Sequence, residues 1–188
     1  MTTVTLATYC HARDLPRLHA PGELESLIGC HSYLFDIVAI VHQRCGDKTD
    51  ELFPWPHPHQ GRLNIYHVEE WNYPDILGRF GIPHRDPILS ENSHGWDAPH
   101  YYEHHCVNHC KVILEAESDY IVFNDADCRM VAQPEGQSWI SKAIELMETR
   151  DDVFIVAPSD GGREYVKLLP DGTLLTDTVS QQLFIGKT

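Results

Sequence analysis

The sequence has 188 residues, of which 42% are hydrophobic and 22% are charged, which excludes a disordered or fibrous chain and favours one globular domain. The 28 Asp and Glu residues outnumber the 14 Lys and Arg residues, so the formal net charge is −14. Because no basic patch offsets this charge, we expect neither nucleic acid nor an anionic membrane as the main partner. An anionic small ligand would need the help of a divalent cation.

The beginning of the chain is polar and shows no apolar leader, and no apolar run along the sequence is longer than a strand. We therefore expect a single domain over residues 1–188, in the cytoplasm, with its six cysteines reduced and no transmembrane segment. Any contact with a membrane would be peripheral. The sequence carries no signal for the oligomeric state.

Hydrophobic patterning predicts alternating strands and helices. Apolar, β-branched runs predict strands at residues 4–8, 35–41, 63–68, 119–124 and 153–157, with a further strand-like segment at 180–186. Apolar residues at helical spacing predict helices at residues 22–29, 100–117 and 138–149, and a short helix at 74–80. This order predicts an α/β, Rossmann-like fold with three layers and a mostly parallel central sheet.

Ligands of such sheets bind at the carboxyl ends of the strands, where the most reactive side chains of this sequence also lie. The strand at 119–124 leads directly into Asp125-Ala126-Asp127. Two carboxylates so close together repel each other, and a shared Mg²⁺ or Mn²⁺ that also takes phosphate oxygens would relieve the repulsion. The alternative is an ordinary turn at a strand end with solvated Asp residues.

The segment from Ala116 to Cys128, with its Tyr-Ile pair and its Asp-x-Asp signature, resembles the family 2-like glycosyltransferases of the GT-A fold. The opening segment Val4–Tyr9 is similar to the first strand of that family, and Leu24–Leu27 to its first helix. The resemblance extends as a pattern over most of the chain. It implies a nucleotide-diphosphate sugar as donor, Mn²⁺ or Mg²⁺ as cofactor, and transfer of the sugar to an acceptor that the sequence does not identify.

The resemblance also implies roles for particular residues of this sequence. Thr8 and Tyr9 would line the nucleotide pocket, Asp125 would contact the ribose, and Asp125 and Asp127 would hold the cation on the diphosphate. Three further residues occupy family positions that contact the nucleotide, although their types depart from the family pattern: His42, Gln43 and Asn108.

The family has its acceptor region and catalytic carboxylate after the segment that corresponds to residues 180–186 of this chain. We therefore expect the acceptor region to be minimal or missing. Asp160 and Asp177 are the weak candidates for a catalytic base.

Two alternatives stay open. One is a non-catalytic module that binds a nucleotide sugar or zinc, the zinc ligands being sought among His105, Cys106, His109 and Cys110, with Cys10 and His11. The other is a nucleotidyltransferase, which would normally have a glycine-rich basic loop after its first strand, whereas residues 8–13 contain no glycine.

Overall fold

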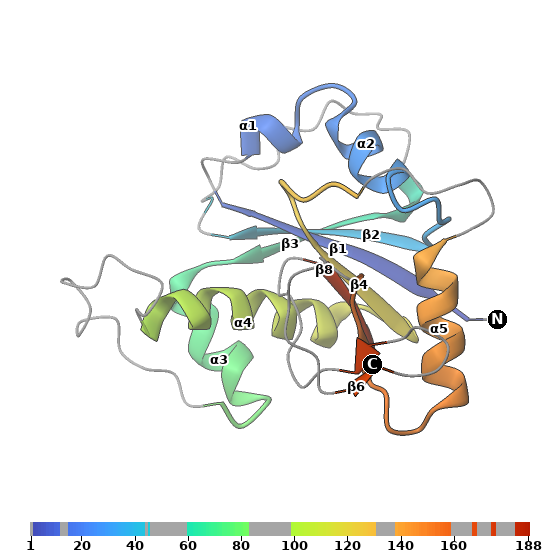
Figure 1. Cartoon of the computed structure of the whole chain (residues 1–188). Helices are drawn as coiled ribbons and strands as arrows, with labels where there is room; N and C mark the ends of the chain where they lie inside the picture. Colours follow the sequence, from blue (N-terminus) through green and yellow to red (C-terminus); the bar gives the residue numbers. More distant parts are fainter. Residues whose placement is uncertain are drawn as a thin grey trace.

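Strands and helices alternate along the chain in the predicted order (Figure 1). The computed structural model describes residues 2–11, 15–43, 45, 60–82, 99–130, 138–158, 167–168, 174–175 and 183–188. The strands are β1 (Val4–His11), β2 (Ile37–Gln43), β3 (Leu63–Val68), β4 (Tyr120–Asp125), β5 (Ile155–Val156), β6 (Lys167–Leu168), β7 (Leu174–Leu175) and β8 (Leu183–Lys187). The helices are α1 (Leu15–Leu18), α2 (Glu23–Gly29), α3 (Tyr73–Gly78), α4 (Pro99–Glu115) and α5 (Trp139–Thr149), with short 3₁₀ turns η2 (Gln60–Arg62) and η3 (Glu70–Asn72).

The main sheet has six strands in the order β3-β2-β1-β4-β8-β5. Strands β1 to β4 pair in parallel, and the register places Tyr9 opposite Asp125 and His11 opposite Gln43. The prediction of an α/β fold with a mostly parallel sheet is therefore confirmed. The carboxyl ends of four neighbouring strands lie along one edge, as the predicted ligand site requires.

Strand β8 is the main departure from a purely parallel sheet. It runs antiparallel between β4 and β5. The strand predicted at 153–157 is shorter in the structure, where β5 comprises Ile155–Val156 at the sheet edge. The strand-like pattern of residues 180–186 was recognised in the sequence, but its position in the sheet was not. A short apolar run carries no information about its neighbours, because pairing is set by contacts distant in the sequence. The small β6–β7 pair and helix α1 were also not predicted.

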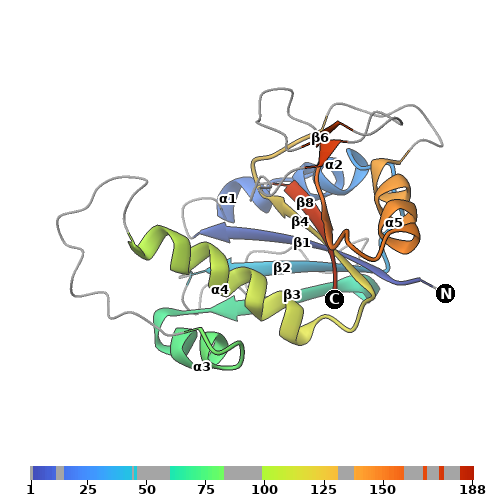
Figure 2. The same cartoon turned by 60° about the horizontal axis from the view of Figure 1, so that its bottom comes forward.

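Helices cover both faces of the sheet and produce the predicted three layers. One hydrophobic cluster joins the sheet to α1, α2 and α5, and a second joins its other face to α3 and α4. Figures 1 and 2 show α1 and α2 on one side of the sheet and α3 and α4 on the other. Burial on both faces explains why the inner strands are apolar without alternation.

The strands β1 and β2 continue beyond their apolar runs. Their parallel ladder extends to the pair His11–Gln43, so polar residues at the ends of both runs are held in regular strand geometry. Helix α5 begins where predicted, because the Ser138 hydroxyl accepts a hydrogen bond from the backbone N–H of Ile140 at 3.3 Å. Among the described residues, no helix has the length and apolar character needed to span a membrane.

The packing of α2 against the sheet gives a direct test of the fold. Leu27 is fully buried in the first cluster, whereas Leu34 in the segment after α2 is 77% exposed. We expect Leu27→Ala to lower the free energy of unfolding by about 2–5 kcal/mol, since it removes buried methyl groups and leaves a cavity. The matched Leu34→Ala variant should change it by less than about 0.5 kcal/mol. Urea denaturation measures both values, and equal effects would contradict this packing.

Candidate functional site

The acidic turn after β4, residues Asp125–Cys128, is the centre of the candidate site. Its backbone closes through a hydrogen bond from the Cys128 N–H to the Asp125 carbonyl at 2.9 Å. The buried Asn124 side chain reinforces the turn, because its Nδ2 donates to the Asp125 carbonyl at 2.7 Å and to the Cys128 carbonyl at 3.2 Å. The turn is thus a fixed structure built by its own neighbours.

The carboxyl group of Asp125 lies in a buried environment that does not favour its charge. Burial raises its pKa to about 6, a hydrogen bond with Tyr9 partly opposes this rise, and the nearby charge of Asp127 adds to it. Its Oδ1 atom is buried and has no hydrogen-bond partner within the described part of the chain. Asp127 is exposed. A buried carboxylate with one oxygen that lacks a hydrogen-bond partner is typical of a site that can bind a cation.

The donor set fits Mg²⁺ or Mn²⁺. Both ions prefer oxygen ligands, and they commonly take one or two protein carboxylates while phosphates and waters supply the rest. The described residues contain no group of three or more His, Cys, Asp or Glu side chains that could hold a metal. Asp125 and Asp127 alone would therefore need a ligand that brings further oxygens, such as a diphosphate.

Tyr9 connects the acidic turn to helix α4. Its ring packs edge-on against His109, with the ring centroids 5.6 Å apart. His109 in turn contacts the rings of Phe123 and Phe184, at 4.6 Å and 5.3 Å between centroids. This aromatic packing fixes the phenol that donates to Asp125.

A second polar group on the same face of the sheet lies at the end of β2. The Asn108 Nδ2 donates to Gln43 Oε1 at 3.1 Å, and Gln43 Nε2 donates to the Tyr73 hydroxyl at 3.0 Å. All three side chains are buried, and Asn108 Oδ1 has no partner among the described residues. The structure therefore brings together two residues that the resemblance had placed near the nucleotide, Gln43 and Asn108.

The predicted residues Thr8 and His42 lie on the opposite face. Both side chains point toward the α1 and α2 layer and are completely buried. The His42 ring lies near the rings of His19 and His67, with centroids 5.5 Å apart in each case. Burial, together with these two imidazoles, lowers the pKa of His42 to about 3. Because strand side chains alternate between faces, Thr8 and Tyr9 point to opposite faces of the sheet. We do not include Thr8 and His42 in the proposed site.

The cysteine and histidine set on α4 is only partly assembled. The Sγ atoms of Cys106 and Cys110 lie 3.9 Å apart, and the hydrogen bond with Cys106 raises the pKa of Cys110. Cys10 belongs to the cluster on the other face of the sheet, and His109 is packed among aromatic rings. The side chain of His105 lies outside the described residues.

The two candidate bases, Asp160 and Asp177, also lie outside the described residues. Sequence analysis missed the residues that support the acidic turn, namely Asn124, Arg129 and Glu23. One signal was present, because Asn124 is the amide that follows the apolar part of β4, and a buried amide normally serves a specific hydrogen bond. Nothing in the sequence links Glu23 to Arg129, which is 106 residues away.

No protein-family model and no curated protein matches this sequence. Solved structures with a similar arrangement include the galactosyltransferase LgtC in complex with donor and acceptor sugar analogues, at 12% identity and a TM-score of 0.46. Another is glucosyl-3-phosphoglycerate synthase from Mycobacterium tuberculosis with Mn²⁺, uridine diphosphate and phosphoglyceric acid, at 15% identity and a TM-score of 0.45. The matches cover 97% and 99% of this chain, but only 57% and 56% of those two chains.

The buried charge of Asp125 predicts a stability cost in the absence of a cation. At pH 7.5 the carboxyl group is ionised in the folded and unfolded states, and its raised pKa means that folding moves the charge to an unfavourable place, so Asp125→Asn should raise the free energy of unfolding by about 1–2 kcal/mol. The exposed control, Asp127→Asn, should change it by less than about 0.5 kcal/mol. Chemical denaturation with a chelator present measures both. A less stable Asp125→Asn protein would show that this carboxylate is a structural group.

Proposed function

We propose that residues 1–188 form the donor-binding domain of a metal-dependent glycosyltransferase, which binds a nucleotide-diphosphate sugar and transfers the sugar to an acceptor still to be identified. The observation that carries this proposal is the buried Oδ1 of Asp125, which lacks a partner in the described structure and stands beside the exposed Asp127. Both carboxylates follow a central strand, at the sheet edge where ligands of α/β folds bind.

In this mechanism Asp125 and Asp127 would hold Mn²⁺ or Mg²⁺, which would supply Lewis-acid chemistry for the departure of the diphosphate. Tyr9 donates a hydrogen bond to Asp125 and so keeps the carboxylate oriented toward the α4 face. Above pH 6 the carboxyl group is ionised and ready to bind the cation, whereas below pH 6 a proton competes with it.

The nucleoside part of the donor would lie along the same edge, toward β2. Gln43 and Asn108 form a buried amide pair there, and the Asn108 Oδ1 atom is an acceptor without a partner among the described residues. An amide pair can both donate and accept hydrogen bonds, which suits the edge of a base better than a phosphate. Asp160 and Asp177 stay the candidates for the base that activates the acceptor hydroxyl.

We also propose that the domain acts in the cytoplasm. None of the six cysteines forms a disulfide bond in this structure, and the sulfur atoms of Cys106 and Cys110 lie 3.9 Å apart as hydrogen-bonded thiols. Thiols that stay reduced at such proximity are typical of proteins in a reducing compartment.

Thermal unfolding in the presence of ligands tests the proposed function. A panel of nucleoside diphosphates and nucleotide sugars is added with and without Mn²⁺. A ligand at about 100 times its Kd should stabilise the native state by about 2.7 kcal/mol, and the shift should require Mn²⁺. The Asp125→Asn protein should fold but lose the shift.

Two outcomes would count against the proposal: no ligand stabilises the wild type, or Asp125→Asn responds equally well. Release of nucleoside diphosphate in the presence of candidate acceptors then separates a transferase from a module that only binds the donor. Turnover supports the former, and binding without turnover across a broad acceptor panel supports the latter.

A further inference from the structure

We propose that Arg129 is a positioning residue that ties the acidic turn to helix α2 through Glu23 and thereby fixes Asp127 for cation binding. This inference rests on the proposed function, because it concerns the same metal site. In this proposal Arg129 acts through the backbone of the turn, whose carbonyls it contacts, and not through contact with the ligand.

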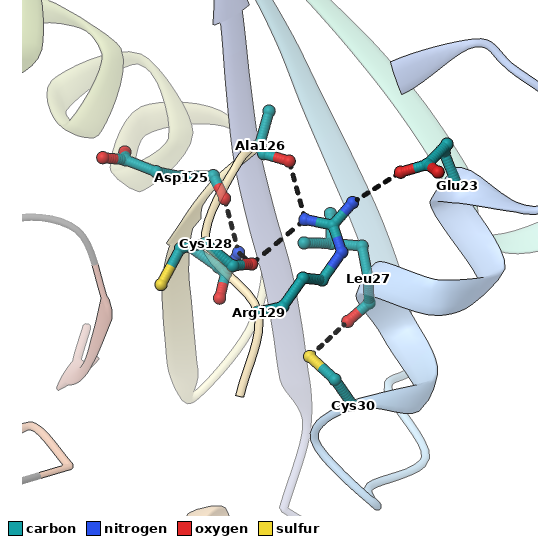
Figure 3. A network of polar contacts seen from close by, with 8 residues as sticks. Glu23, Leu27, Cys30, Asp125, Ala126, Cys128 and Arg129 are labelled. Atoms are coloured by element: carbon teal, nitrogen blue, oxygen red, sulfur yellow. Dashed lines mark hydrogen bonds and ion pairs between the residues drawn. The ribbon is translucent and has the colours of Figure 1, made fainter. Parts of the chain in front are cut away.

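The contacts of Arg129 surround Asp127 on both sides. Its Nη1 donates to the carbonyl of Ala126 at 2.7 Å and to that of Cys128 at 3.0 Å, the residues immediately before and after Asp127. Its Nη2 pairs with Glu23 Oε2 at 3.2 Å (Figure 3). One guanidinium group therefore holds the carbonyls of the two residues that flank Asp127 and connects them to another element.

Helix α2 is a firm anchor for this contact. Glu23 is the first residue of α2, and the helix is fixed to the sheet by the buried side chains of Leu24 and Leu27. The Glu23 and Arg129 side chains are 39% and 23% exposed. A pair with this exposure adds little to global stability, so its main effect is to restrict the turn locally.

Asp125 does not depend on Arg129 in the same way. Its backbone belongs to β4 and is held by Asn124, and its carboxyl group bonds to Tyr9. Figure 3 shows the Asp125 side chain turned away from Arg129, toward α4. Loss of the Arg129 contacts should therefore leave Asp125 in place and allow the backbone at Asp127 to move.

Lysine cannot replace arginine here. The planar guanidinium group donates in several fixed directions and can reach two carbonyls and a carboxylate at once, whereas an ammonium group is a single point charge on a flexible stem. The conservative variant Arg129→Lys keeps the charge near the turn but loses this geometry. A purely electrostatic role would be rescued by lysine, and a positioning role would not.

The experiment measures Mn²⁺ affinity by electron paramagnetic resonance of the free ion, first without and then with a nucleoside diphosphate. Removal of a group that orients a metal ligand commonly weakens metal binding by about 10-fold or more, and we expect about 10-fold for Arg129→Lys. Glu23→Gln should weaken binding in the same direction, and the double variant should be no worse than Arg129→Lys alone, because both changes break one connection.

The matched control is Arg150→Lys, which alters another arginine paired with a carboxylate, Asp152, at 2.7 Å on the surface. It should leave Mn²⁺ affinity unchanged. Thermal unfolding without Mn²⁺ should be nearly the same for the wild type and all variants. A general loss of structure would instead lower stability and affinity together.

Three results would overturn the inference. Equal Mn²⁺ affinity of Arg129→Lys and wild type would refute it while leaving the proposed function intact. Tighter binding of nucleoside diphosphate by Glu23→Gln would mean that Glu23 restrains an Arg129 that contacts phosphate directly. Failure of the wild type to bind Mn²⁺ with any nucleotide would overturn both the inference and the proposed function.

Discussion

The proposed metal site depends on one unfavourable interaction, the burial of the Asp125 carboxyl group at the end of β4. The strand fixes the backbone of this residue, the Tyr9 phenol satisfies part of its carboxylate, and Oδ1 has no partner in the described structure. A buried carboxylate without a full set of hydrogen bonds lowers the stability of the fold, and such groups occur mainly at functional sites, where a ligand supplies the missing interaction. A divalent cation shared with the exposed Asp127 would remove it.

The two faces of the sheet carry residues with different proposed roles at this site. The α3 and α4 face carries the residues that we propose bind the donor, Asp125, Tyr9 and the Gln43–Asn108 pair. The α1, α2 and α5 face carries the support, where Asn124 and Arg129 hold the turn. Asn124 also influences the titration of the buried His31, whose imidazole Nδ1 accepts a hydrogen bond from Trp139 of α5 at 3.3 Å. The alternation of side chains along β1 and β4 produces this division.

The central fold was predictable because its signals are local. Apolar runs and helical spacing located β1 to β4, α2, α4 and α5, and the Asp-x-Asp segment located the acidic turn. The insertion of β8 between β4 and β5 and the bridge from Glu23 to Arg129 join parts of the chain that are distant in sequence, so no local pattern encodes them. Thr8 and His42 were assigned to the site from the family resemblance, and the alternation of strand side chains places both on the α1 and α2 face of the sheet.

The pKa of the Asp125 carboxyl group, followed by ¹³C nuclear magnetic resonance of its side-chain carbon, tests the central claim most directly. Without a cation the group should titrate near pH 6, since it is buried and incompletely bonded. With Mg²⁺ and a nucleoside diphosphate bound, the midpoint should move well below its ordinary value of about 4, because the cation favours the ionised form. A midpoint near 4 without a cation, or one that the cation and nucleotide leave unchanged, would contradict the account.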